Sequence, residues 1–77
     1  MIPVYDLPTV SQLPTGARLH FWHWWRGGVE AGIANFEGKY GRAPAFALVT
    51  DGHCYFPYAE DAPLPTGLKE RSGNKPV

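Results

Sequence analysis

The clearest hydrophobic pattern lies in residues 28–40. Apolar side chains recur there every three or four residues, which is the spacing of one face of an α-helix. The repeating residues are Val29, Ile33, Phe36 and Tyr40. Gly27 or Gly28 serves as the N-cap, and Gly41 favours the left-handed conformation that ends a helix. Because Pro44 cannot continue a helix, the pattern predicts one that stops near Tyr40.

Small residues inside this helix predict a smooth side that another element approaches closely. They are Ala31, Gly32, Ala34 and Gly38. A glycine inside a helix costs about 1 kcal/mol relative to alanine, so its presence needs a reason. Close packing of the helix on a sheet is the simpler explanation, and a ligand site is the alternative.

After Pro44 the pattern changes from helical spacing to alternation, which is typical of β-strands. Residues 45–50 and 53–58 flank Asp51-Gly52, a strong signal for a tight β-hairpin turn. A two-residue turn fixes the register of the two strands. One face then carries the pairs Thr50–His53, Leu48–Tyr55 and Phe46–Pro57, and the other carries Val49–Cys54 and Ala47–Phe56. Small alanines opposite large aromatics favour a helix over this second face.

Residues 17–25 form the first predicted strand, and alternation divides its side chains into two sets. The first set, expected beneath the helix, is Leu19, Phe21, His23 and Trp25. The second set, expected on the opposite face, is Arg18, His20, Trp22, Trp24 and Arg26. Aromatic rings flanked by arginines make this second set the most unusual group in the chain.

These elements predict an α+β fold with the order strand, helix, strand, strand. We expect a small three-stranded sheet with one helix on one face, formed by residues 17–58. The first strand would run parallel to residues 45–50 if the two are neighbours. Residues 1–16 form a proline-rich extended arm, which lies along the domain's own sheet or reaches a second subunit. Residues 59–77 form an irregular, partly disordered C-terminal tail.

Composition narrows the class of protein. The chain has 77 residues, is 44% hydrophobic and carries a formal net charge of zero. Neutrality argues against nucleic acid or an anionic membrane held by bulk electrostatics. The sequence has no long apolar run and no basic-then-apolar leader, so no membrane partner is predicted. A single cysteine excludes an internal disulfide framework and favours the reducing cytoplasm.

The predicted sheet face opposite the helix is the candidate interaction face. Its members are Arg18, His20, Trp22, Trp24, Arg26, Phe46, Leu48, His53 and Tyr55. So short a chain cannot leave this face bare, and either the proline-rich arm or a partner covers it. The leading hypothesis is a protein-interaction or self-assembly module, a homo-oligomer, that uses this face or an exposed edge strand. The alternative is single-stranded nucleic acid, with bases stacked on Trp22, Trp24 and Tyr55 and with phosphate contacted by Arg18, Arg26 and His20.

Metal binding and catalysis are two further alternatives. His20, His23, His53 and Cys54 are suitable zinc ligands, but neighbours in a strand point to opposite faces. Cys54 as a nucleophile needs a base and a positive group nearby. Its neighbour His53 is expected across the sheet, and His23 is the other candidate base, on roughly the same face. We therefore predict no metal, no cofactor and no catalytic residue, and an enzyme is not favoured.

Overall fold

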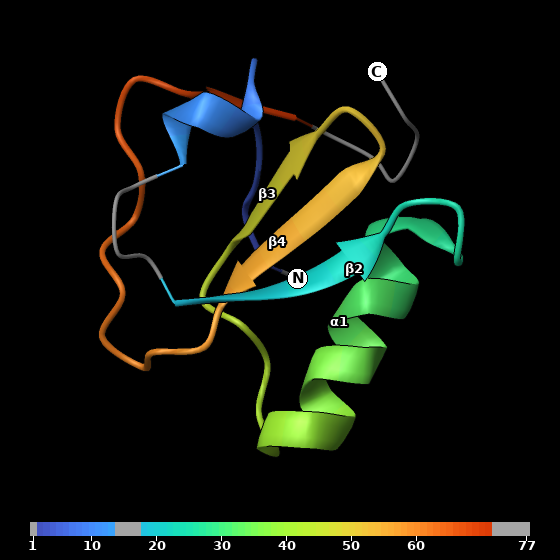
Figure 1. Ribbon diagram of the computed structural model, residues 1–77. Helices are drawn as coiled ribbons and strands as arrows, with labels where there is room; N and C mark the ends of the chain where they lie inside the picture. Colours follow the sequence, from blue (N-terminus) through green and yellow to red (C-terminus); the bar gives the residue numbers. More distant parts are fainter. Residues whose placement is uncertain (1, 14–17, 72–77) are drawn as a thin grey trace.

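The computed structural model describes residues 2–13 and 18–71, which form one α-helix and a five-stranded mixed sheet (Figure 1). The elements in chain order are β1 (Val4–Asp6), the 3-10 helix η1 (Val10–Gln12), β2 (Leu19–His23), α1 (Gly28–Tyr40), β3 (Ala47–Thr50), β4 (His53–Pro57) and β5 (Lys69–Glu70). The strand order in the sheet is β2-β4-β3-β1-β5. The α+β class is therefore confirmed.

The sheet has two more strands than the sequence predicted. Part of the proline-rich arm forms β1, which pairs in parallel with β3, and part of the tail forms β5, which pairs antiparallel with β1. Pro3 and Pro8 flank β1 and stay out of it, so its backbone N–H groups remain available for pairing. The Val4–Asp6 part of the arm therefore lies along the domain's own sheet, which was the first of the two alternatives, whereas residues 1 and 14–16 of the arm lie outside the described residues.

The hairpin between β3 and β4 forms in the predicted register. Thr50 pairs with His53, Leu48 with Tyr55 and Val49 with Cys54. Asp51 and Gly52 both have positive φ, at 40° and 80°, as a type I′ turn requires.

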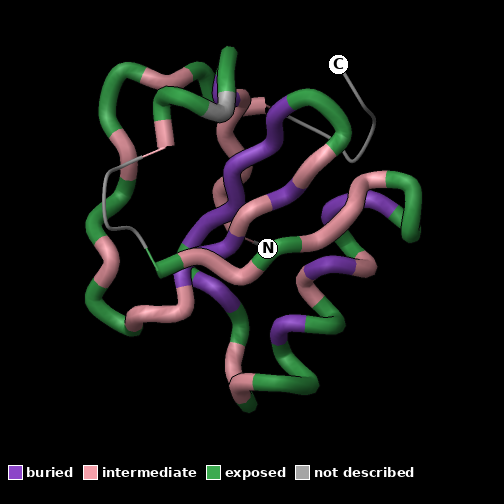
Figure 2. The backbone as a smooth tube through the Cα atoms, in the orientation of Figure 1, coloured by how far each residue is buried: buried purple, intermediate pink, exposed green. Residues whose placement is uncertain are grey.

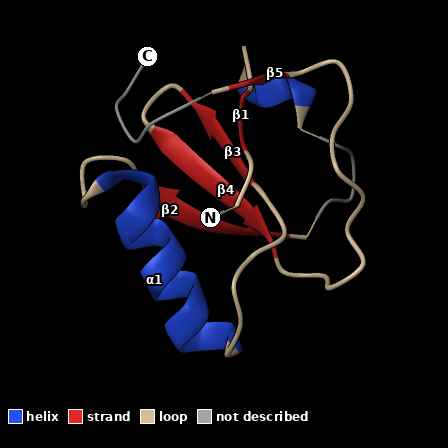
Figure 3. Ribbon diagram, turned by 180° about the vertical axis from the view of Figure 1, so that it is seen from behind, coloured by secondary structure: helices blue, strands red, loops and turns tan. Residues whose placement is uncertain are grey.

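The predicted helix also forms, between glycines that take the left-handed conformation. Gly27 is the N-cap with φ 101°, and Gly41 is the C-cap with φ 74° and donates its N–H to the Glu37 carbonyl. The helix lies over the β2 and β4 end of the sheet, on one face only (Figure 3). Of the small residues, Gly32 is the one that permits close packing, because a Cβ there would lie 2.7 Å from Phe56 Cζ. Gly38 has nothing within 4 Å of such a Cβ, so its part in the predicted smooth side is wrong.

Strand β2 differs from its prediction in position and in orientation. It is antiparallel to β4, and β4 separates it from β3. The pair Phe21–Tyr55 shares the face opposite α1, so the predicted orientation of β2 is reversed. Trp22 lies beneath Gly32 of the helix, with Cδ1 3.0 Å from a Cβ built there. The reversal follows from the pairing with β4, because directly opposed residues of an antiparallel pair point to the same face.

The hydrophobic core lies between α1 and the middle of the sheet. Its buried members are Val29, Phe36, Ala47, Val49, Cys54 and Phe56. β3 is buried along its whole length, whereas every residue of β2 is half-buried or exposed (Figure 2). This difference makes β2 the accessible long strand of the sheet.

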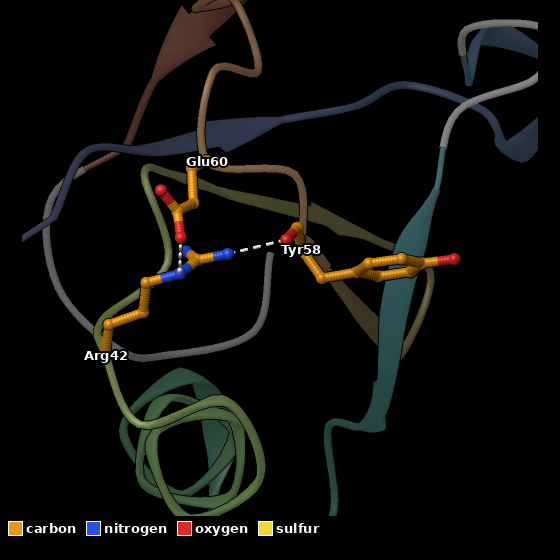
Figure 4. A network of polar contacts seen from close by, with 3 residues as sticks. All are labelled: Arg42, Tyr58 and Glu60. Atoms are coloured by element: carbon orange, nitrogen blue, oxygen red, sulfur yellow. Dashed lines mark hydrogen bonds and ion pairs between the residues drawn. The ribbon is translucent and has the colours of Figure 1, made fainter.

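An arginine fixes the point at which the chain leaves β4. The Arg42 guanidinium donates to the Tyr58 carbonyl, and its Nε lies 3.7 Å from a carboxylate oxygen of Glu60 (Figure 4). Residues 63–68 then lie over the outer face, which we define as the sheet face opposite α1. An open hollow of about 540 Å³ there is lined by this segment together with Leu7, Gln12, Phe46 and Leu48.

Candidate interaction site at strand β2

The residues of the predicted interaction face lie on both sides of the sheet. His20, Trp22 and Trp24 lie on the side of α1 or against the core, whereas Phe46, Leu48, His53 and Tyr55 lie on the outer face. The prediction of one continuous face is therefore wrong. Only the residues in and next to β2 lie on the side opposite to the one predicted, since the residues of the β3–β4 hairpin occupy the face predicted for them.

On the helix side, the aromatic residues of β2 and of the turn that follows it already have partners in this chain. His20 Nε2 lies 2.8 Å from Asn35 Oδ1, a hydrogen bond between β2 and α1. The Arg26 guanidinium carbon lies 4.7 Å from the centre of the Trp22 ring, a cation–π contact. Trp24 has the same kind of contact with Arg71, at 5.2 Å. These rings therefore hold the helix, the edge strand and the C-terminal segment together.

On the outer face, the part over β3 is covered by the chain itself. Phe46 and Leu48 are only 6% and 3% exposed. They line the hollow beneath residues 63–68, as described above. Their part of the predicted interaction face is thus occupied within the monomer.

The outer face remains accessible at β2, where we define the aromatic patch as Phe21, His23, Trp25, His53 and Tyr55. Phe21 lies at its centre, with ring centres 4.6 Å from His23, 5.1 Å from His53 and 5.5 Å from Tyr55. Trp25 stacks on His23 at 4.1 Å. Phe21 is 41% exposed and Trp25 is 72% exposed. Large apolar rings this exposed are typical of interaction surfaces when they are contiguous.

The histidines of the patch are placed poorly for a metal. His23 and His53 oppose each other across β2 and β4, but Nδ1 of each ring is buried and has no hydrogen-bond partner among the described residues. Within residues 2–13 and 18–71, no three of His, Cys, Asp and Glu gather as ligands.

Cys54, the candidate nucleophile, lies in the core. It is fully buried beneath α1, and this burial raises its pKa from 9.0 to about 11, although the positive charge of Arg71 acts in the opposite direction. A thiol with a raised pKa has little thiolate near neutral pH. The two candidate bases, His53 and His23, oppose each other on the outer face, away from the Cys54 thiol.

The backbone of β2 presents a second feature, an unpaired strand edge. The Tyr58 N–H donates to the Arg18 carbonyl, and the Trp24 N–H donates to the Gly52 carbonyl. In an antiparallel pair such bonds alternate, so the even-numbered residues of β2 bond to β4. The N–H and C=O groups of Leu19, Phe21 and His23 therefore point to the other edge, where no described strand lies. One of them, the His23 carbonyl, already accepts a hydrogen bond from the Arg26 N–H.

Sequence reasoning missed Phe21, His23 and Trp25 as patch residues. It assigned them, with Leu19, to the side beneath the helix. The hairpin register already placed Tyr55 and His53 on the outer face, so a known β2–β4 pairing would have moved Phe21 and His23 there as well. The missing information was strand order, which depends on contacts far apart in the sequence.

Comparison with protein-family models, with curated proteins and with solved structures gave no significant match. Function is therefore inferred from the geometry of this chain. Among the described residues, no helix combines the length and the apolar character needed to cross a membrane.

Proposed function

We propose that this chain is a self-assembly module that acts through β2, by its free edge and the aromatic patch, with no catalytic activity of its own. The observation that carries the proposal is the coincidence of both features on one strand. An unpaired edge supplies backbone hydrogen bonds, and exposed aromatic rings supply apolar area. Protein association through an added strand uses these two contributions together.

The composition of β2 supports this role. Natural edge strands that stay unpaired usually carry lysine, proline, a bulge or a covering loop. β2 has the sequence LHFWH, with no proline and no lysine, and its exposed ring, Phe21, stands at the middle. The opposite edge of the sheet contrasts with it, because β5 has two residues and both are exposed and charged.

Single-stranded nucleic acid has less support as a partner. The rings expected to stack bases, Trp22, Trp24 and Tyr55, do not share a face. Arg26 stacks on Trp22 within the chain, so it is engaged where it was expected to contact phosphate. A single-stranded oligonucleotide at low salt should leave the tryptophan fluorescence unchanged, and a saturable change would favour this alternative.

The test of self-assembly is absolute mass in solution. Light scattering behind a sizing column, at two concentrations a factor of about ten apart, should give a mass above the 8.5 kDa of the chain, rising with concentration. Trp25→Ala should lower the mass, because it removes one ring of the aromatic patch. Since Trp25 is 72% exposed, its loss costs the fold little. Leu64→Ala is the matched control, since Leu64 is also exposed, at 56%, but lies away from β2. A mass of 8.5 kDa at both concentrations would contradict the proposal.

A further inference from the structure

We infer that the partner of β2 is β2 of a second copy, paired antiparallel about a two-fold axis at Phe21. This inference rests on the proposed function and specifies its geometry. It follows from three observations: the spacing of the edge groups, the side chains that the pairing brings together, and the difference between the two edges of the sheet.

The edge groups of β2 are self-complementary. Antiparallel pairing requires that outward-pointing residues of one strand meet outward-pointing residues of the other. These residues are Leu19, Phe21 and His23, and one register pairs all three with one another: Phe21 with Phe21, and Leu19 with His23. The axis then passes between two Phe21 residues that exchange N–H···O=C bonds. The His23 N–H and the Leu19 carbonyl extend the ladder on either side.

The same register brings compatible side chains together. On the outer face, Phe21 of each copy meets its equivalent, so the two aromatic patches become one continuous surface. On the helix side, His20 of each copy lies opposite Trp22 of the other. The register opposes no charged side chain to another of like charge, which favours association of identical strands.

The two edges of the sheet predict that assembly stops at two copies. Pairing of β2 with β2 uses the same surface on both partners, so it closes on itself. Growth into a filament would need β2 to pair with β5, which has two residues, Lys69 and Glu70, both exposed. β2 has five residues. The product is a dimer with one ten-stranded sheet, twice the five strands of the monomer.

Proline substitution tests the backbone pairing. Phe21→Pro removes an N–H that points away from β4 and faces none of the strands formed by residues 2–13 and 18–71, so the β2–β4 ladder stays intact. Phe21→Ala is the matched control, because it removes the same ring and keeps the N–H. Loss of two backbone hydrogen bonds per dimer predicts a dissociation constant about 30-fold higher for the proline variant than for the alanine variant. Circular dichroism should show that both variants fold. Equal dissociation constants in folded variants would overturn edge pairing.

Cross-linking tests the register. Residues that face each other at such a position have Cα atoms about 5.5 Å apart, within the range of a disulfide. Phe21→Cys should therefore form a disulfide-linked dimer on oxidation, whereas Leu19→Cys alone should not. A mixture of Leu19→Cys and His23→Cys should again cross-link. The native Cys54 stays out of the reaction because it is fully buried.

The outcomes separate this inference from the proposed function. A mass of 8.5 kDa at every concentration overturns both. A dimer by mass in which Leu19→Cys links to itself, or in which none of these cysteines link, keeps self-assembly and overturns the Phe21 register. A dimer that links through Phe21→Cys supports both.

Discussion

Replacement of Gly32 by alanine tests whether α1 packs on the sheet as described. A Cβ at this position would lie 2.7 Å from Phe56 Cζ and 2.9 Å from Phe56 Cε2. It would also lie 3.0 Å from Trp22 Cδ1. Phe56 is 0% exposed and its ring packs against Phe36, so any movement of the ring disturbs the core. The new methyl group must therefore shift the helix or strain the core.

The magnitude comes from comparison with a second glycine of the same helix. Gly38 is exposed and has nothing within 4 Å of an added Cβ. Gly38→Ala should therefore show only the gain in helix propensity, about 1 kcal/mol. Gly32→Ala has the same gain, opposed by an overpacking cost of about 1–3 kcal/mol. We expect the unfolding free energy of Gly32→Ala to be lower than that of Gly38→Ala by about 1–3 kcal/mol.

Urea denaturation followed by circular dichroism measures this difference, provided that both variants share one m-value. The two variants should be compared at a single protein concentration, because self-assembly couples stability to concentration. If Gly32→Ala proved as stable as Gly38→Ala, the helix could not lie on Phe56 at the distance described. A lower m-value for Gly32→Ala alone would indicate a change in compactness, and the comparison would then be repeated with serine at both positions.

Three further predictions concern single side chains. Burial raises the Cys54 pKa to about 11, whereas the unfolded chain releases this proton near 9.0, so the unfolded state gains stability as pH rises between these values. Between these two pH values the unfolding free energy of the unmodified protein should fall more steeply than that of Cys54→Ala, by up to about 1.4 kcal/mol per pH unit. An identical dependence on pH in the two proteins would contradict a buried thiol. Thr50 is 2% exposed and its hydroxyl has no partner among the described residues. Thr50→Val should therefore raise the unfolding free energy, measured in urea, by up to about 1 kcal/mol. A lower unfolding free energy would mean that the Thr50 hydroxyl is hydrogen-bonded in the folded protein. Arg42→Ala should lower the unfolding free energy by about 1–3 kcal/mol, because the Tyr58 carbonyl loses a charged donor. Glu60→Ala should change it by less than about 0.5 kcal/mol, because the Glu60 side chain is 84% exposed. Equal effects of the two substitutions would show that the hydrogen bond from Arg42 to Tyr58 is not the stabilising contact.

Local signals account for the parts of the fold that were predicted correctly. Gly27, Gly41 and Pro44 limit α1 without help from the rest of the chain, because their conformational preferences act within a few residues. The Asp51-Gly52 turn fixes the β3–β4 register in the same way, since both residues take positive φ at low cost. These signals act within the elements that they limit, so they can be read without knowledge of the strand order.

The orientation of β2 could not be obtained from its own residues. Both alternating sets contain aromatic rings and a histidine, so burial of either set is compatible with the pattern. The choice was made by pairing with β4, which aligns Phe21 with Tyr55, and by Gly32, which leaves room for Trp22 beneath the helix. The candidate site changed with this choice, because Phe21 became exposed and Trp22 became part of the packing.

The sequence by itself determined the α+β class, the helix with its two glycine ends, and the hairpin with its register. Tertiary structure alone decided that the arm and the tail add β1 and β5 to the sheet, that β4 lies between β2 and β3, and that β2 remains at an edge. The physical reason is the range of the interactions. Caps and turns depend on neighbouring residues, whereas strand order depends on which distant segments bury the most apolar area and satisfy the most backbone groups together.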